Sequence, residues 1–393
     1  MSVDVKRAAL IVYATVVFGV GAFGAWQAPL SFDERRFYFP AIQSLGRELP
    51  HVPVNYALPQ PPAMLVIQAV VWRVTGSVAL IRALSSIAVI AAVFLAGAIV
   101  ARSDLPSVLL VLMVGTFPTI FLNAWSLKQH AFTLAFLLAA VLAWKRRRIG
   151  WVAVFLALAT LTNQLSLALA ATFGIVALVR FVRDRSRDAF IDVVVTGCSV
   201  IPLFALVLAW HGVQPPLFAA AFPEVPGSRF NPAQVLLALI MIGFWIAPLI
   251  VQPRRWWPLL VLVPLCAILL FASGLLLPVG NDIYAGAVGP VTNVIRSVTR
   301  AYAVTIAATA LLAALGVLFF RDVRSTEAWL YIVLCGVALT RVPYYFESYY
   351  ALVVCVVWPL AADDVIAKRR VAMQSAYILA GATYAIVKVI SGV

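Results

Sequence analysis

Two carboxylates and two guanidinium groups are adjacent in the segment Asp33-Glu34-Arg35-Arg36, directly after the first long apolar run. Charges this close to hydrocarbon are costly unless they are paired or used. A carboxylate can accept the proton of an attacking hydroxyl, and cations can stabilise charge on a departing phosphate. Inverting glycosyl transfer needs both, so we predict that Asp33 and Glu34 are catalytic, with Asp33 as the general base. The alternative is a helix end whose charges pair with one another at the headgroup level.

Two further clusters place polar residues beside or inside apolar runs, where polar groups usually face a cavity or another helix. In the first, we predict that Lys128 contacts a donor phosphate and that Gln129 and His130 contact an acceptor or sugar. Snorkelling would explain the lysine but not the histidine. In the second, Asn163 and Gln164 are predicted sugar or acceptor contacts. Hydrogen bonding between helices is the alternative for that pair.

A fourth group of candidates combines arginine and tyrosine late in the chain. Arginine binds phosphate through a fork of donors, and tyrosine offers a ring to a lipid tail or sugar and a hydroxyl to the head group. A polyprenyl phosphate needs this mixture. We therefore predict donor binding by Arg296, Arg300, Arg341, Tyr344 and Tyr345, with Glu347 on the acceptor side. The alternative is an aromatic belt with snorkelling arginines.

The elements that position these residues must be membrane helices. Of 393 residues 64% are hydrophobic and 11% are charged, which is too much apolar surface for a soluble chain to bury. The sequence predicts an all-α, polytopic integral membrane protein, one transmembrane domain over residues 1–393. About thirteen spans fit the apolar runs, each near the length that crosses a bilayer as helix. They lie at residues 8–29, 78–101, 105–123, 130–144, 149–163, 165–182, 191–211, 233–251, 257–278, 301–320, 327–340, 349–362 and 371–390.

Basic residues concentrate in alternate short loops, and the positive-inside rule places those loops and the N-terminus inside. The opposite face then has the longer loops, and it holds most of the candidate residues. Its first loop, residues 30–76, is predicted to contain interfacial helices, since the apolar stretch from Pro61 to Thr75 is too short to span. This topology explains most of the net charge of +14, so no nucleic-acid partner is expected.

No metal or other cofactor is expected. The four cysteines lie inside apolar runs without C-x-x-C spacing, which argues against a zinc site. The outer carboxylates are scattered along the sequence, which gives no argument for a hard cation.

The first loop resembles that of the C superfamily of membrane glycosyltransferases (GT-C). The features concerned are Asp33-Glu34, then Pro40 and Gln43, then Pro61-Pro62 and an apolar stretch ending at Gly76. The likeness covers roughly residues 26–175 and fades after them. It is nearest to the glucosyltransferase that caps the N-glycan precursor, followed by protein O-mannosyltransferases and aminoarabinose transferases. Phe117-Pro118-Thr119 and Thr162-Asn163-Gln164 are similar to stretches of the first of these.

The resemblance implies a GT-C-like fold, a polyprenyl-phosphate sugar donor, and an active site on the lumenal or periplasmic face with Asp33 as base. The acceptor would be a glycan, lipid or protein, and membrane lipids would surround the enzyme. The chain departs from the pattern at Glu347-Ser348-Tyr349, where a more basic run is expected. Arg341 or Arg296 would then bind the phosphate, and glucose is not specifically indicated.

Three other functions remain open. A polymerase or ligase of undecaprenyl-diphosphate-linked glycans would share the outer arginines and histidines, but usually has its large loop later in the chain. A transporter or flippase of lipid-linked sugars would usually show repeated halves or ionisable residues at mid-membrane. A structural or assembly subunit would tolerate loss of Asp33. The Arg- and Ala-rich composition indicates a bacterial inner membrane, with the active site facing the periplasm.

Overall fold

The computed structural model describes residues 3–51, 55–221, 233–251, 257–273, 287–288, 291, 295, 302–340, 345–346, 348–367 and 371–390. These residues are helical apart from short turns and one parallel pairing of β1 (Ala287–Val288) with β2 (Tyr345–Phe346). The predicted helical class is therefore confirmed. The chain packs as two compact units, one of Met1–Val225 with Gln374–Val393 and one of Pro226–Met373. The predicted single transmembrane domain stays a prediction.

Five helices are long and apolar enough to cross a membrane: Val5–Ala25, Val78–Ile99, Gln164–Asp184, Arg187–Trp210 and Tyr302–Asp322. Other apolar helices are shorter, at Ala63–Thr75, Leu105–Thr116, His130–Lys145, Ile149–Thr160, Ala233–Trp245, Leu259–Ser273, Thr326–Leu339, Tyr350–Leu360 and Val371–Val387. This composition is that of an integral membrane protein. The helices begin and end near the predicted bounds, while the number of thirteen spans is not confirmed.

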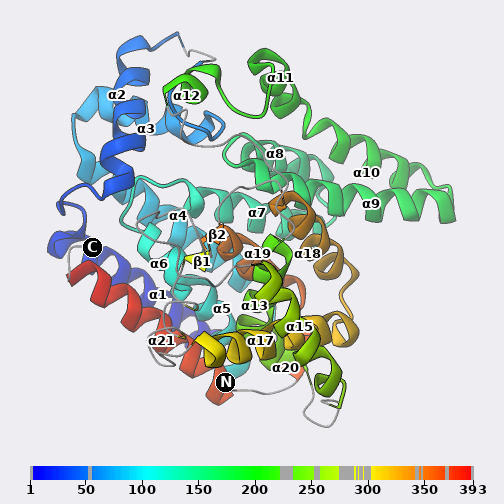
Figure 1. Cartoon of the computed structure of the whole chain (residues 1–393). Coiled ribbons are helices and arrows are strands. Elements are labelled where there is room, and N and C mark those ends of the chain that lie inside the picture. Colours follow the sequence, from blue (N-terminus) through cyan, green and yellow to red (C-terminus); the bar gives the residue numbers. More distant parts are fainter. Residues whose placement is uncertain are drawn as a thin grey trace. The chain divides into compact units, whose positions relative to one another are not determined.

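The first unit contains the helices that carry the early candidates (Figure 1). In chain order they are α1 (Val3–Val20), η1 (Gly21–Ala25), η2 (Glu34–Tyr38), α2 (Phe39–Glu48), α3 (Ala63–Thr75), α4 (Val78–Ile99), α5 (Leu105–Thr116), α6 (Pro118–Asn123), α7 (His130–Lys145), α8 (Ile149–Thr160), η3 (Gln164–Ser166), α9 (Leu167–Asp184), α10 (Arg187–Cys198), α11 (Ile201–Trp210) and α12 (Pro216–Ala221). From Gln374 on, α21 (Val371–Ile390) also belongs to this unit.

The predicted first outer loop folds as a small cap built on α2 and α3. Apolar positions on α2, among them Ile42 and Leu45, are fully buried in one cluster with Leu65 and Ala69 of α3. The same cluster takes in Leu127, which lies just before α7. A loop between two membrane helices has thus acquired its own core, and it can hold side chains at fixed positions.

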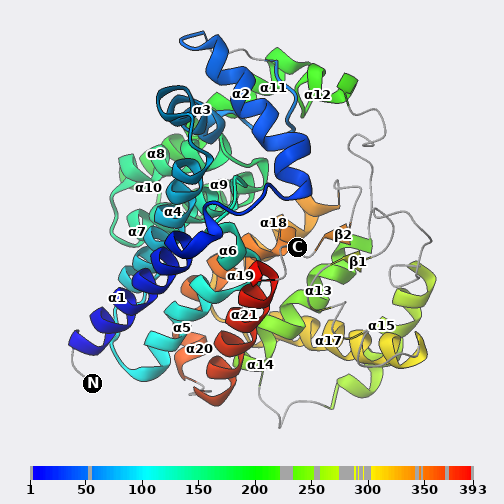
Figure 2. The same cartoon turned by 90° about the vertical axis from the view of Figure 1, so that its left-hand side faces the viewer.

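The first helix is hydrogen-bonded to the segment that contains α5 and α6. Pro118, at the start of α6, separates these two helices. Tyr13 Oη donates to the carbonyl oxygen of Gly115 at 2.8 Å, and Trp125 Nε1 donates to that of Val17 at 3.0 Å. Gly381 of α21 lies so close to this break that a Cβ would be 2.0 Å from the carbonyl oxygen of Thr116. The end of the chain therefore packs beside α5 and α6 (Figure 2).

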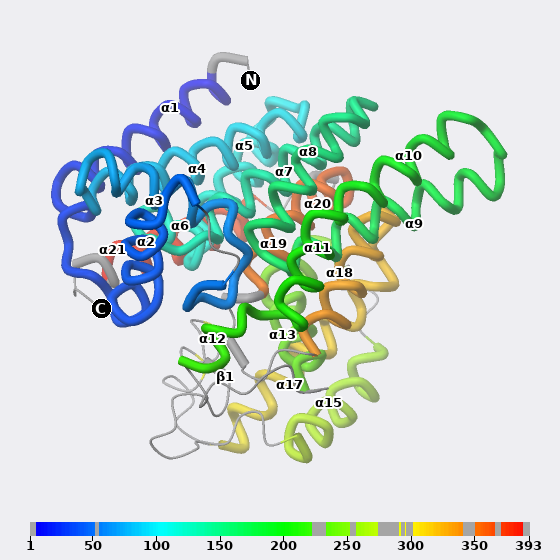
Figure 3. The backbone as a smooth tube through the Cα atoms, turned by 90° about the horizontal axis from the view of Figure 1, so that it is seen from above, coloured from blue at the N-terminus to red at the C-terminus, as the bar shows by residue number. Residues whose placement is uncertain are grey.

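The region around Asn163 contains two helices separated by a turn. α8 ends at Thr160, η3 follows, and α9 then runs to Asp184 and pairs with α10 as a hairpin (Figure 3). Gln164 Nε2 donates to the carbonyl oxygens of Pro59 and Val213, at 3.0 and 3.1 Å. This turn and the cap therefore lie at the same end of the unit.

Basic residues gather at the opposite ends of the same helices. Lys6 Nζ donates to the carbonyl oxygens of Val100 at 2.5 Å and Arg102 at 3.2 Å, which joins the start of α1 to the end of α4. Arg147, in the turn after α7, lies 3.5 Å from Asp192 of α10. These two basic groups lie at the helix ends away from the cap, and the predicted orientation in the membrane stays a prediction.

The second unit is built around α13 (Ala233–Trp245) and α17 (Tyr302–Asp322). Its other helices are α14 (Ala247–Ile250), α15 (Leu259–Ser273), α18 (Thr326–Leu339), α19 (Ser348–Leu360) and α20 (Ala362–Ala367). Glycines let α13 and α17 approach to backbone contact, since a Cβ on Gly316 would lie 2.2 Å from the carbonyl oxygen of Leu239. On α19, Tyr350 Oη donates to the carbonyl oxygen of Gln234 at 2.5 Å.

Candidate functional site

The structure brings Asp33 and Lys128 into direct contact. Lys128 Nζ lies 2.6 Å from Asp33 Oδ2. Asp33 follows the first candidate span, and Lys128 lies two residues before α7, so the pair stands where two apolar helices meet the cap. The Asp33 side chain is 45% exposed and that of Lys128 31% exposed. Exposed ion pairs contribute little to stability, so either partner can be exchanged for a charged ligand at small cost.

Glu34 has a different environment from its neighbour Asp33, while the catalytic role of both carboxylates stays a prediction. Its side chain is 3% exposed, and Arg82 Nη2 lies 2.8 Å from its Oε2. The same oxygen accepts from the backbone N–H of Ser31 at 2.9 Å, and Oε1 accepts from that of Leu127 at 2.8 Å. A carboxylate bound on both oxygens and shielded from solvent is poorly placed to take a proton from a substrate.

These contacts also determine the charge state of Glu34. Burial acts to raise its pKa, but the bond and charge of Arg82 with the two backbone N–H groups outweigh burial. The pKa of Glu34 therefore lies below the ordinary value of 4.5, and the side chain is ionised at neutral pH.

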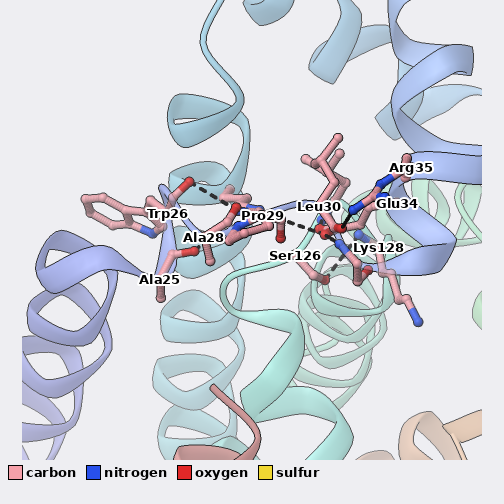
Figure 4. A network of polar contacts seen from close by, with 12 residues as sticks. Ala25, Trp26, Ala28, Pro29, Leu30, Glu34, Arg35, Ser126 and Lys128 are labelled. Atoms are coloured by element: carbon pink, nitrogen blue, oxygen red, sulfur yellow. Dashed lines mark hydrogen bonds and ion pairs between the residues drawn. The ribbon is translucent and has the colours of Figure 1, made fainter. Parts of the chain in front are cut away.

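Arg82 is the residue that sequence reasoning missed. Its side chain is 2% exposed, and besides Glu34 it binds carbonyl oxygens just after the first span, including Ala28 at 2.5 Å and Trp26 at 3.3 Å. Figure 4 labels the residues that bear these oxygens. Carbonyls at a helix end have no partner within the helix, so one guanidinium satisfies several of them. The signal was available, because Arg82 is a single charge inside an otherwise apolar span.

Gln129 and His130 extend the Asp33–Lys128 pair into the unit. Gln129 is 2% exposed, yet neither Oε1 nor Nε2 has a hydrogen-bond partner among the described residues. His130 Nδ1 is also buried without such a partner, and the ring interacts electrostatically with Lys128 and Asp33. Each buried polar atom left unsatisfied costs about 1–3 kcal/mol. Such a cluster beside a charged pair indicates a place for a polar ligand or for water.

Asn163 and Gln164 make hydrogen bonds within the protein, and their role as sugar or acceptor contacts stays a prediction. Asn163 Oδ1 accepts from the backbone N–H of Leu165 at 2.9 Å and caps the start of η3. The amide nitrogen of Gln164 donates to the carbonyl oxygens of Pro59 and Val213. The sequence left hydrogen bonding between helices as the alternative; the bonds observed are within the turn and to loop carbonyls at Pro59 and Val213.

The side chains of the late candidates lie outside the part of the chain that the structure describes. Arg296, Arg300, Arg341, Tyr344 and Glu347 lie outside the described residues, and Tyr345 is described only through its backbone in β2. Their predicted roles in donor and acceptor binding stay predictions.

Comparison with models of protein families, with curated proteins and with solved structures found no match. The resemblance to GT-C enzymes therefore stays an expectation from the motifs. Within the described part of the chain, no group of three or more His, Cys, Asp or Glu side chains is placed to hold a metal ion. The chemistry of this site must be argued from Asp33, Lys128, Gln129 and His130.

Proposed function

We propose that this chain is an inverting glycosyltransferase that moves a sugar from a polyprenyl-phosphate donor to a hydroxyl of a glycan, lipid or protein. The single observation that carries the proposal is the 2.6 Å contact between Asp33 and Lys128 at the end of two apolar helices. The contact joins a half-exposed carboxylate to an ammonium group. Its place at the end of two apolar helices supports a site at the level of lipid phosphates.

The reaction assigns each group one task. The acceptor oxygen attacks the anomeric carbon while Asp33 takes its proton, and the bond from that carbon to the donor's phosphate oxygen breaks. The polyprenyl phosphate leaves with the electron pair of this bond. Lys128 offsets the negative charge that develops on it. The sugar is transferred with inversion, and the proton on Asp33 passes to solvent.

The unpartnered side chains supply a place for the sugar. Gln129 offers one acceptor and two donors, and a sugar hydroxyl can both donate and accept. A ligand hydroxyl would remove the cost of burying these atoms without partners. The same atoms can contact either the donor's sugar or the acceptor. The transferred sugar is a hexose or a pentose.

The distribution of charge supports an outer-face site. Within the first unit the basic turns lie at the helix ends away from the cap, and the Asp33–Lys128 pair lies beside the cap. By the positive-inside rule, this distribution supports a periplasmic position for the pair, in the bacterial inner membrane that the composition indicates.

The test is turnover of a panel of labelled polyprenyl-phosphate sugars by the purified protein in nanodiscs, with a total lipid and glycan extract as acceptor. We expect consumption of one donor, and a loss of about 10²–10⁴-fold for Asp33→Asn, the usual contribution of a general base. Glu48→Gln removes an exposed carboxylate of the same loop, whose Oε1 accepts a bond from Ser44, and serves as the matched control.

Full activity of Asp33→Asn would remove Asp33 as the base. If folded wild-type protein consumes no monophosphate donor but extends a diphosphate-linked glycan, the polymerase is the better assignment. Movement of lipid-linked sugar between leaflets without bond cleavage would assign a flippase instead.

A further inference from the structure

Leu127, the residue before Lys128, is held through its backbone N–H, its carbonyl oxygen and its side chain. The Leu127 N–H donates to Glu34 Oε1 at 2.8 Å, and the Leu127 carbonyl oxygen accepts from Gln68 Nε2 at 3.1 Å. The Leu127 side chain is fully buried in the core of the cap. Lys128 therefore starts from a backbone position with little freedom.

Serines of α4 bind the residues just before Leu127. Ser85 Oγ donates to the carbonyl oxygen of Ser126 at 2.7 Å, and Ser86 Oγ donates to that of Ala124 at 2.6 Å. Positions 82, 85 and 86 lie on one face of a helix because they are three and four residues apart. One polar stripe on α4 thus binds the segment that carries Lys128.

The same stripe binds the segment that carries Asp33. Arg82 holds the carbonyl oxygens of Ala28 and Pro29, at 2.5 and 3.3 Å, and the carboxylate of Glu34 at 2.8 Å. Glu34 in turn reaches across to the Leu127 N–H. Its two oxygens therefore connect both segments to each other and to α4 (Figure 4).

We propose that Glu34 and Arg82 are positioning residues, which set the spacing between Asp33 and Lys128 without taking part in proton transfer. The importance of this distance for catalysis rests on the proposed function. The effect of Glu34 and Arg82 on the distance does not depend on that function. Two adjacent residues, Asp33 and Glu34, face two adjacent residues, Leu127 and Lys128. The inner contact, between Glu34 and the Leu127 N–H, is buried, and the outer contact, between Asp33 and Lys128, is half-exposed.

The size of the expected effect follows from geometry. A displacement of about 1 Å between reacting groups can cost about 100-fold in rate. Loss of the inner contact would let the two segments separate while Asp33 and Lys128 both remain present. The rate would then fall while the titrating base stays the same.

The first test measures spacing directly and needs no substrate. The chain has five lysines, so the labelling of Lys128 by an amine-reactive reagent can be followed by mass spectrometry, with exposed Lys145 as internal reference. Asp33→Asn should increase the labelling rate of Lys128 several-fold, and Glu34→Gln should do the same although Asp33 is intact. Labelling that rises in Asp33→Asn but not in Glu34→Gln would overturn the proposal, as would labelling unchanged in both.

The second test uses the donor found in the turnover assay and compares pH profiles. Glu34→Gln should lower kcat about 10- to 100-fold, by misplacement, but keep the acidic limb of the wild-type profile. A profile that loses this limb in Glu34→Gln would make Glu34 the base and overturn the proposal. If no donor reacts, the proposed function fails, and the labelling experiment still decides the spacing.

Comparing a single variant with the double variant separates loss of the contact from destabilisation by an unpaired buried charge. Arg82→Gln alone leaves Glu34 as a buried unpaired charge, whereas Glu34→Gln/Arg82→Gln leaves none. If the two residues act as one unit, the double variant should label Lys128 no faster than the faster single variant. Additive increases from the two substitutions would show that they act separately and would overturn the proposal.

Discussion

Lys128 Nζ contacts Asp33 Oδ2 at 2.6 Å although the two residues are 95 positions apart in the sequence. The contact is half-exposed, so the pair adds little to stability and can open when a charged ligand arrives. Next to this contact, Glu34 is buried and forms an ion pair with Arg82. Separating that buried pair would cost more free energy, because each charge would be left buried without a partner. The site therefore combines a replaceable charge pair with a fixed one.

Replacing the lysine should weaken donor binding. Lys128→Met keeps the apolar stem but removes the ammonium group that meets the phosphate. We expect KM for the donor to rise about 10- to 100-fold, since a hydrogen bond to a charged group is worth about 1.5–3 kcal/mol. Lys128→Arg should recover part of the loss because the charge is restored. Donor KM measured by initial rates checks this, and an unchanged KM in Lys128→Met would exclude the phosphate contact.

Replacing the unpartnered glutamine should affect stability and activity in opposite directions. Gln129→Leu removes two buried polar atoms that have no partner among the described residues, so unfolding in detergent should occur at the same temperature or higher. Transfer activity should fall, because the contact to a sugar hydroxyl is lost.

A second buried glutamine provides the control for Gln129. Gln234 is fully buried too, but its Oε1 accepts a bond from Tyr350 Oη at 3.1 Å. Gln234→Leu should therefore lower the unfolding temperature. A lower unfolding temperature for Gln129→Leu, matching that of the control, would mean that Gln129 has a structural partner.

Acid should destabilise the fold through Glu34. Its pKa is lowered in the folded protein, so its ionised form stabilises the fold at neutral pH. That contribution is complete above the ordinary value of 4.5 and is lost as the pH falls from there through the lowered pKa. Unfolding temperatures measured from pH 7 to pH 3 should fall less steeply in Glu34→Gln than in wild type. Parallel curves would contradict the lowered pKa.

The second unit should be destabilised by a larger residue where α13 and α17 are in backbone contact. Gly316→Ala places a Cβ 2.2 Å from the carbonyl oxygen of Leu239, so α13 and α17 must separate. Overpacking of this kind costs about 1–3 kcal/mol of unfolding free energy. Gly336→Ala, on α18 with no heavy atom within 4 Å of the added Cβ, is the control and should be neutral or stabilising. Equal unfolding temperatures for both variants would contradict the close approach.

The sequence predicted the apolar helices and the candidates Asp33, Lys128, Gln129 and His130 because these depend on local signals. Apolar runs of the right length form helices in a membrane, and charged residues at their ends attract notice. It predicted Glu34, Asn163 and Gln164 as functional for the same reason, and the structure gives them structural contacts. A polar residue next to an apolar run has the same appearance in either role.

By itself, the sequence determined which residues bear charge and which segments must be helical, since composition and periodicity are properties of the chain. Only the tertiary structure decided the different environments of Asp33 and Glu34. They are neighbours of the same chemical type, and their difference comes from Arg82 and the Leu127 N–H, which reach Glu34 from 48 and 93 residues away. The roles of two neighbouring carboxylates depend on such distant partners, because burial and hydrogen bonding govern whether a carboxylate can exchange a proton.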